Sequence, residues 1–387
     1  MIYNFDEVVE RCSTDAAKWS IYDAETLPLW VADMDFVSPE PVIRALHERV
    51  NHQIFGYSLP PQELAEIVCD RMHRLYRWSV APEEILYVPG IVAGINIVAR
   101  AVARPGEGML VQTPVYPPFL TAPGNQGLDL QMAELSLVRQ DQTVHYELDD
   151  EVFHEAITPE TRLFVLCNPH NPIGRGYTEE ELSRMAAICL KHNLTVCSDE
   201  IHADLLLGDT SHIPMATLAP EISKRCVTLI APSKTYNIPG LKCGMAIIQD
   251  PALRRTVQAA MGGLDHTVNI FGFIGALAAY LEGDDWLRQV LAYLTANRDY
   301  LIRYLHDQLP GIATTFPQAT YLAWLDCQNL GITGSPFDFF LTQAKVALND
   351  GKTFGPGGEG FVRLNFGCPR STLTEALDRM KTAVQAL

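Results

Sequence analysis

The middle of the chain repeats one pattern, in which a short apolar segment is followed by a stretch with helical periodicity. The apolar segments of strand length are Ile85–Val88, Gly108–Gln112, Arg162–Cys167, Leu194–Cys197, Val227–Ile230 and Met245–Ile248. Such alternation is typical of a mostly parallel sheet with helices on both faces. We therefore predict an α/β fold built on a mostly parallel sheet. Its first crossover helix should cover Ile91–Ala103, directly after Gly90.

The pattern changes near residue 284. A long helical stretch over Trp286–Leu309 is followed by a few strands and by a last helical stretch over Thr372–Leu387. This part predicts a smaller α+β domain, which the amino-terminal segment completes. A chain of 387 residues is long enough for two domains with sizeable cores. We expect a large domain over residues 47–283 and a small domain formed by residues 1–46 and 284–387.

Charge and cysteine usage exclude several classes of function. The net charge of −17 argues against a nucleic-acid or anionic-membrane partner, because both require clustered cations. The nine cysteines are scattered and form no Cys-x-x-Cys pair, which indicates a reducing compartment. Residues 1–7 lack a basic region and an apolar signal core. The longest apolar stretch, Ile270–Leu281, is shorter than the ~20 residues that span a bilayer. We expect a cytoplasmic protein.

Polar residues follow or interrupt four of the predicted strands. Asn171 lies in a Pro-rich turn after one strand, Asp199 ends the next, Lys234 follows a third, and Arg363 interrupts the alternating strand Phe361–Gly367. The carboxyl ends of strands in an open α/β sheet converge on one crevice, so these four side chains are expected to face one ligand. A lysine amine attacks aldehydes once its surroundings lower its pKa. The competing interpretation of Lys234 is an exposed lysine at a strand end.

Several longer motifs accompany these residues. They are Pro28–Phe36 (Pro-Leu-Trp-Val-Ala-Asp-Met-Asp-Phe), Phe55–Tyr57 (Phe-Gly-Tyr), Thr113–Phe119 (Thr-Pro-Val-Tyr-Pro-Pro-Phe), Asp199–His202 (Asp-Glu-Ile-His) and the run from Ala231 to Gly244 around Lys234. With them, the chain resembles fold-type I pyridoxal-phosphate enzymes of the class I/II aminotransferase superfamily. Within it, the chain resembles the MalY/PatB-type cystathionine β-lyases, also called C–S lyases. The likeness extends from near residue 28 to residue 370.

The resemblance implies a sheet of the seven-stranded type found in the large domain of these enzymes, and pyridoxal 5′-phosphate (PLP) as cofactor. It also implies a role for each key residue. Lys234 would hold the cofactor in a covalent imine and later accept the substrate's Cα proton. Asp199 would pair with the pyridine nitrogen, although an aspartate here could instead cap a helix at Glu200. Asn171 would bind the phenolic oxygen, unless it only shapes the turn. Arg363 would bind the substrate α-carboxylate through two parallel hydrogen bonds.

Further site residues follow from the same resemblance. Tyr116 would stack on the ring, with a rigid surface aromatic as the alternative. The N–H groups of Ile91 and Val92 and the side chains of Ser233 and Lys242 would bind the phosphate. Tyr321 and the segment from Trp30 to Asp35, which includes Ala32, would line the substrate pocket, unless both only serve packing. His202 replaces the tyrosine found in many aminotransferases, so a cofactor contact and a satisfied polar residue are both open. Tyr57 resembles a tyrosine that reaches the cofactor of the neighbouring subunit, which implies a homodimer; a buried core tyrosine is the alternative. No metal site is expected, because the histidines do not have zinc-site spacing.

The implied reaction is β-elimination from cystathionine or a related S-substituted cysteine. Its products would be a thiol (homocysteine from cystathionine), pyruvate and ammonia. The same residues would also support transamination, so a class I/II aminotransferase is the alternative. A third hypothesis is an added regulatory role through contact with a transcription regulator, for which the sequence holds no specific signal.

Two glycine-containing motifs imitate nucleotide sites. Gly355–Gly360 matches a dinucleotide-binding glycine pattern but precedes a strand and opens no helix. Gly351-Lys352-Thr353 imitates the end of a phosphate-binding loop, yet Val346 occupies the position of its first glycine. We interpret this region as a loop that leads to the strand of Arg363.

Overall fold

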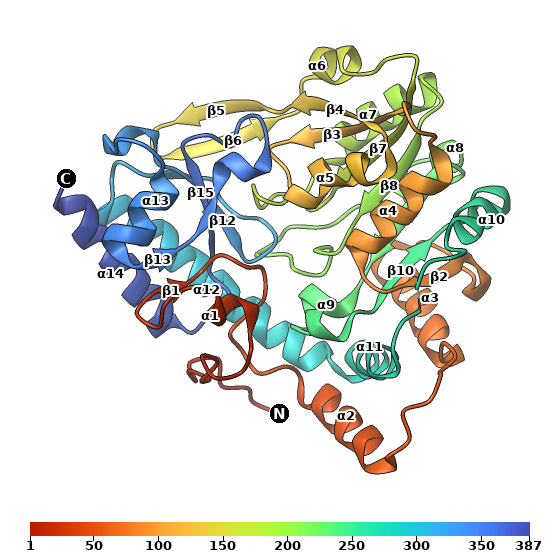
Figure 1. The fold of residues 1–387 in the computed structure, drawn as a ribbon, viewed down its shortest axis with the longest axis horizontal. Coiled ribbons are helices and arrows are strands. Elements are labelled where there is room, and N and C mark those ends of the chain that lie inside the picture. Colours follow the sequence, from red (N-terminus) through yellow and green to blue (C-terminus); the bar gives the residue numbers. More distant parts are fainter. Residues whose placement is uncertain (266) are drawn as a thin grey trace.

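The computed structural model describes residues 1–265 and 267–387 (Figure 1). Its central sheet has seven strands in the order β2-β10-β9-β8-β7-β3-β4. Their bounds are β2 (Ile85–Val88), β3 (Gly108–Thr113), β4 (Asp129–Glu134), β7 (Thr161–Cys167), β8 (Thr195–Asp199), β9 (Cys226–Ile230) and β10 (Gly244–Ile247). Only β10 runs against its neighbours, so the prediction of a mostly parallel sheet is confirmed.

Helices cover both faces of this sheet. They are α2 (Glu40–His52), α3 (Gln62–Tyr76), α4 (Ile91–Val102), α5 (Pro117–Gln126), α7 (Glu179–Lys191), α10 (Pro251–Ala260) and α11 (Ile270–Glu282). Strand β7 shows why both faces need cover. Leu163 and Val165 pack into the core on one face, whereas Phe164 and Leu166 pack into the core on the other. Alternate strand residues point to opposite faces, so an uninterrupted apolar strand must be buried twice.

A second sheet has the order β14-β15-β12-β11-β6-β5. Its strands are β5 (Ser136–Gln140), β6 (Thr143–Glu147), β11 (Ala313–Thr314), β12 (Leu322–Asp326), β14 (Asn349–Asp350) and β15 (Phe361–Asn365). The hairpin of β5 and β6 therefore joins strands that follow it by more than 160 residues in the chain, although it lies inside the range 47–283. The division into two domains stays a prediction.

The remaining elements are shorter, apart from two long helices. The long helices are α12 (Asp284–Gln308) and α14 (Arg370–Gln385). The short ones are α1 (Ala17–Ser20), α6 (Asp150–Glu155), α8 (Pro220–Ser223), α9 (Pro232–Thr235) and α13 (Pro336–Phe339), with 3₁₀ turns at Pro82–Glu84, Met215–Thr217, Pro239–Leu241, Gln328–Leu330 and Gly351–Phe354 and a π-helical turn at Phe340–Ala344. Strand β1 (Leu27–Pro28) pairs in parallel with β13 (Val346–Ala347), which ties the amino-terminal segment to the carboxyl-terminal part.

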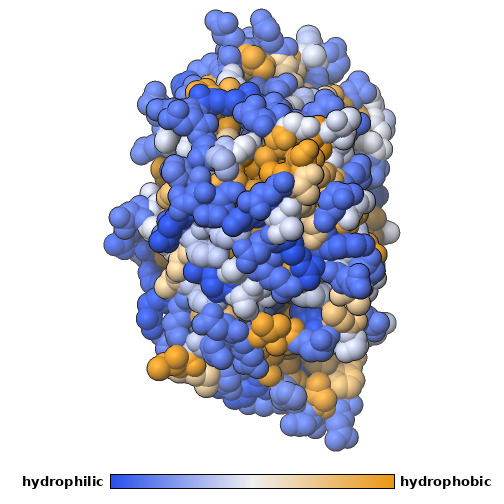
Figure 2. Space-filling view, turned by 90° about the vertical axis from the view of Figure 1, so that its left-hand side faces the viewer, coloured by the Kyte–Doolittle hydropathy of each residue, from blue (hydrophilic) through white to orange (hydrophobic). Residues whose placement is uncertain are grey.

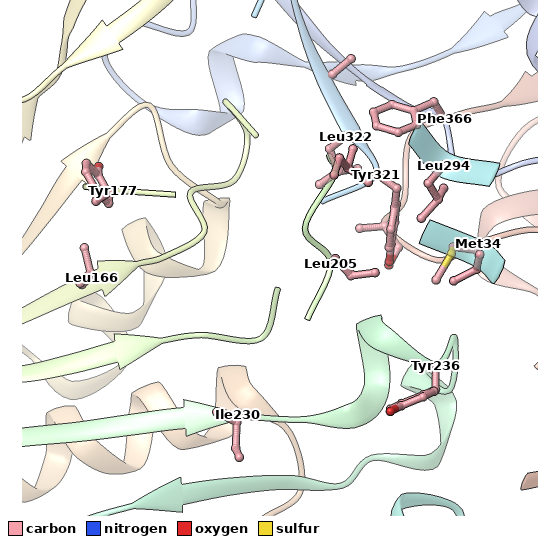
Figure 3. Close-up of a cluster of buried hydrophobic side chains, with 14 of the residues drawn as sticks. Met34, Leu166, Tyr177, Leu205, Ile230, Tyr236, Leu294, Tyr321, Leu322 and Phe366 are labelled. Atoms are coloured by element: carbon pink, nitrogen blue, oxygen red, sulfur yellow. The ribbon is translucent and has the colours of Figure 1, made fainter. Parts of the chain in front are cut away.

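A buried apolar cluster joins the central sheet to the carboxyl-terminal part (Figure 3). Met34 of the amino-terminal segment, Leu294 of α12 and Tyr321, which precedes β12, belong to it. So does Tyr236, which directly follows α9. Because these residues are distant in sequence, burying them together fixes the amino-terminal segment beside the loop that carries Lys234.

The surface is polar over most of one side. The side at the left of Figure 1, where α14 and β5 lie, is largely hydrophilic with small separate hydrophobic patches (Figure 2). In contrast, large apolar side chains are exposed along the connection between α2 and α3, among them Ile54, Phe55 and Leu59. None of the described helices has the length and hydropathy needed to cross a bilayer.

Candidate active site

The predicted site residues converge on one cavity of about 270 Å³. It lies where β7, β8 and β9 end and α4 begins. Ten of the predicted residues line it: Ala32, Ile91, Val92, Tyr116, Asn171, Asp199, His202, Ser233, Lys234 and Lys242. Arg363, Tyr321 and Tyr57 are not among the lining residues. The convergence follows from the parallel strands of the sheet, whose carboxyl ends lie at the same edge.

Lys234 is held on the short helix α9, directly after β9. Its Nζ donates a hydrogen bond to the backbone oxygen of Ala32 at 2.6 Å. Burial, together with the nearby Arg363 cation, lowers the pKa of Lys234 to about 8. A larger fraction of this amine is therefore unprotonated near neutral pH than for a surface lysine, which suits a nucleophile.

Asp199 ends β8 with its side chain only 5% exposed. Burial raises the pKa of its carboxyl to about 7, and the hydrogen bond from the Ile201 N–H (3.1 Å) partly offsets this. Residues 201–204 form a turn and not a helix, so the helix-cap interpretation is not supported. The second carboxylate oxygen is left for a ligand. A protonated ring nitrogen would fit it, because a positive partner repays the cost of burying the charge.

The amino end of α4 offers an anion site. Gly90 precedes the helix with φ of 129°, a conformation that residues with side chains rarely adopt. The N–H groups of Ile91 and Val92 donate to no protein acceptor in residues 1–265 or 267–387. Free N–H groups at a helix start attract phosphate. Ser233 and Lys242 line the same cavity and could supply a hydroxyl and a positive charge.

Tyr116 and Asn171 line the cavity between Asp199 and the amino end of α4, and an aromatic side chain there suits a flat aromatic ligand. The Tyr116 N–H donates to the Asn171 backbone oxygen at 3.1 Å, which fixes the tyrosine beside Asn171. The Asn171 side-chain oxygen accepts from Arg363 Nη1 at 2.9 Å, so its amide N–H groups remain for a ligand oxygen.

His202 faces the same cavity with an unsatisfied ring. In the described residues its ring makes no hydrogen bond, and its Nδ1 is buried without a partner. Burial and the cations Lys234 and Arg363 lower the pKa of His202 to about 3, so the ring is neutral. A buried orphan nitrogen at a cavity wall indicates a group that a ligand would satisfy.

Arg363 lies in the middle of β15 and is 3% exposed. Besides Asn171, its guanidinium donates to the backbone oxygen of Trp30 at 2.9 Å and to the side-chain oxygen of Asn349. Its charge centre lies 5.0 Å from the centroid of the Phe354 ring. Tyr321 is also buried, and its hydroxyl donates to the backbone oxygen of Ala32, a cavity-lining residue, at 2.9 Å.

Residues 30–36, here called the strap, include the segment from Trp30 to Asp35 that was expected either to line the substrate pocket or to serve packing. Their backbone oxygens accept hydrogen bonds from Lys234, Tyr321 and Arg363. Asn365 Nδ2 donates to the oxygens of Val31 and Asp33, both at 2.7 Å, and the Asn237 side chain bonds to the backbone of Met34 and Phe36. The roles of Asn237 and Asn365 were missed, because a sequence does not reveal which backbone a side-chain amide will meet.

The site agrees with the relationships of the whole chain. The family described as aminotransferase class I and II matches residues 25–380. The chain belongs to this family. It is 39% identical to the cystathionine beta-lyase PatB of Bacillus subtilis, over 98% of this chain and 100% of that protein. It is 31% identical to the protein MalY of Escherichia coli, with both chains covered completely.

Among solved structures, the fold of this class I and II aminotransferase family member is similar to a PLP-bound C–S lyase from Staphylococcus hominis. The TM-score is 0.93 at 32% identity, with 99% of this chain and 98% of that one covered. The family that the motifs predicted is thereby confirmed.

Proposed function

We propose that this protein is a PLP-dependent C–S β-lyase that cleaves cystathionine or related S-substituted cysteines to a thiol, pyruvate and ammonia. One observation carries the proposal. A chain similar over its full length to a cystathionine beta-lyase has a buried amine, carboxylate and guanidinium around one cavity, and none of the three is in an ion pair within the described residues. Buried charges without partners are costly, which favours a ligand that completes them.

The cavity lining fits PLP at each end. The N–H groups of Ile91 and Val92, with Ser233 and Lys242, would hold its phosphate. Tyr116 would cover one face of its ring, Asp199 would sit at the ring nitrogen, and Asn171 would donate to the phenolic oxygen. When bound, PLP supplies an electron sink that stabilises negative charge on the substrate's Cα.

The protein side chains would then act in sequence on the substrate. Lys234 would hold the cofactor covalently and, once the substrate amine has replaced it, accept the Cα proton. Arg363 would orient the substrate by its α-carboxylate. Asp199 would keep a negative charge beside the ring nitrogen and so preserve the electron-withdrawing form of the ring.

We also propose that the active unit is a homodimer. Tyr57 is fully exposed, as are the nearby Ile54, Phe55 and Leu59 in large part. All four belong to the connection between α2 and α3, which runs at the lower right of Figure 1. Apolar side chains gathered on one exposed segment are typical of a protein interface. A second copy that covers this segment would let Tyr57 reach the cofactor of its neighbour. The cytoplasmic location remains a prediction from the sequence.

The deciding experiment is turnover without an acceptor. The purified holoenzyme is incubated with cystathionine or an S-substituted cysteine and no keto acid, and pyruvate and free thiol are measured. Multiple turnovers support the lyase. An absolute requirement for a keto acid would instead establish the aminotransferase alternative, and Lys234→Ala serves as the blank. The regulatory hypothesis would gain support only if this inactive variant kept a partner-dependent phenotype.

A further inference from the structure

Arg363 is a buried cation whose protein partners are all neutral. Its hydrogen-bond acceptors are the side-chain oxygens of Asn171 and Asn349 and the backbone oxygen of Trp30. No carboxylate lies within ion-pair distance of Arg363 in the part of the chain that the structure describes. These three acceptors therefore fix the orientation of the guanidinium, whereas no anion within the described residues compensates its charge. Such an arrangement favours binding of an anion from outside the chain.

Asn349 owes its place to strand pairing. Strand β14 pairs with β15 in antiparallel register, and Asn349 lies directly opposite Arg363. Residues opposite each other in an antiparallel pair project to the same face, so the amide can reach the guanidinium. Asn171 lies in the turn that follows β7 of the central sheet, and its side-chain oxygen accepts from another nitrogen of Arg363.

The loop after β14 keeps this pairing tight. A Cβ on Gly351 would lie 2.3 Å from the Gly358 oxygen and 2.4 Å from the Phe361 oxygen, so only glycine fits there. The same loop brings Phe354 beneath the guanidinium, with its ring centroid 5.0 Å away. The glycine-containing region that imitates nucleotide motifs thus has a structural task, which is to support Arg363.

We propose that Asn349 is a positioning residue that aims the Arg363 guanidinium at the substrate carboxylate and, by being neutral, leaves the arginine charge free for that carboxylate. The proposal rests on the proposed function, in which Arg363 binds the substrate. A carboxylate at position 349 would form an internal ion pair with Arg363 and compete directly with the substrate. A residue that cannot accept a hydrogen bond would leave the guanidinium less well oriented.

The test compares two ligands that differ only in the carboxylate, L-alanine and ethylamine. Their affinities for the holoenzyme are measured from the change in cofactor absorbance, for the wild type, Asn349→Ala and Asn349→Asp. We expect Asn349→Asp to weaken L-alanine binding at least ~30-fold and Asn349→Ala about 5-fold, while ethylamine binding changes by no more than about twofold. In turnover, KM for an S-substituted cysteine should rise more than kcat falls.

The matched control is Asn193→Asp, which makes the same charge change before β8, at the end of that strand opposite Asp199. It should leave both affinities as in the wild type. Equal weakening of both ligands by the Asn349 variants would indicate a merely structural role and overturn the proposal, as would unchanged L-alanine binding in Asn349→Asp. Failure of the lyase function would appear separately, as absence of pyruvate in the wild type with the ligand preference intact.

Discussion

Two largely buried polar clusters in this molecule differ in whether their charges are paired within the chain. The amino-terminal ion cluster consists of Arg11, Lys18, Asp33 and Asp35. Lys18 Nζ lies 2.6 Å from Asp35 Oδ2, and Arg11 contacts Asp35 at 2.6 Å and Asp33 at 2.9 Å. The cavity cluster consists of Asp199, Lys234 and Arg363, and within the described residues none of these forms an ion pair.

This difference distinguishes charged groups that stabilise the fold from charged groups that are available to bind a ligand. In the amino-terminal ion cluster each cation has an anion, so the cost of burial is offset inside the chain, and the pairs anchor the strap. In the cavity cluster the cost of burial is not offset. The pKa of Asp199 is raised and the pKa of Lys234 is lowered, and both shifts favour the neutral form of the side chain. Buried ionisable groups with shifted pKa values are typical of functional sites.

The largest effect is expected for Lys234→Ala. Loss of the amine should abolish covalent cofactor attachment and lower turnover by at least ~10⁴-fold. Borohydride reduction followed by peptide mass analysis should find the cofactor on residue 234 in the wild type only. The surface substitution Lys191→Ala is the control. If the cofactor of the wild type were found on another residue, the proposal that Lys234 binds it covalently would be wrong.

The second effect concerns Asp199→Asn. The amide keeps the shape but not the negative charge, so kcat for elimination should fall about 10³-fold. Because Asp199 has no ion-pair partner in the described chain, the free energy of unfolding of the cofactor-free protein should fall little or rise. Denaturant unfolding and steady-state kinetics test the two halves. A large loss of stability would mean that the carboxylate has a structural partner.

The third test contrasts the clusters by stability. Lys18→Met removes a fully buried cation from Asp35 and should cost about 3 kcal/mol in the free energy of unfolding. Arg363→Met removes a cation without a counter-ion and should change the stability of the cofactor-free protein by less than about 1 kcal/mol. Urea unfolding of both variants measures this. Equal costs would break the distinction between the clusters.

The smallest effect is a pH shift. Below its pKa of about 8, Lys234 is protonated and has no lone pair with which to attack an aldehyde. The rate of PLP attachment to the cofactor-free enzyme should therefore rise with pH through a midpoint near 8. In Arg363→Met the midpoint should move upward, because the Arg363 cation lowers the pKa of Lys234. Stopped-flow absorbance gives both profiles, and an unmoved midpoint would contradict the coupling.

The sequence was sufficient for the parts that obey local patterns. The apolar runs predicted the buried strands β7, β8 and β9 to within a residue or two, since strands covered on both faces are apolar throughout. The edge strand β4 and the hairpin of β5 and β6 were missed, because their exposed faces carry polar residues that interrupt the apolar pattern.

The site was predictable where chemistry follows a strand end and unpredictable where it depends on long-range pairing. Asp199 and Lys234 could be named because each lies a few residues after an apolar run, and their roles followed from the family resemblance. Asn349 carried no signal of its own, since its importance arises only from lying opposite Arg363. The contact of Tyr321 with the strap, through the Ala32 backbone oxygen, likewise carried no signal in the sequence, and its role in the substrate pocket stays a prediction.

The strap has a practical consequence for dissecting the protein. Lys234 and Arg363 rely on backbone oxygens that lie 202 and 333 positions earlier in the chain. A fragment that began after residue 36, including one limited to residues 47–283, would retain the central strands but lose both acceptors. Truncations and fusion tags at the amino terminus should therefore be expected to affect the active site.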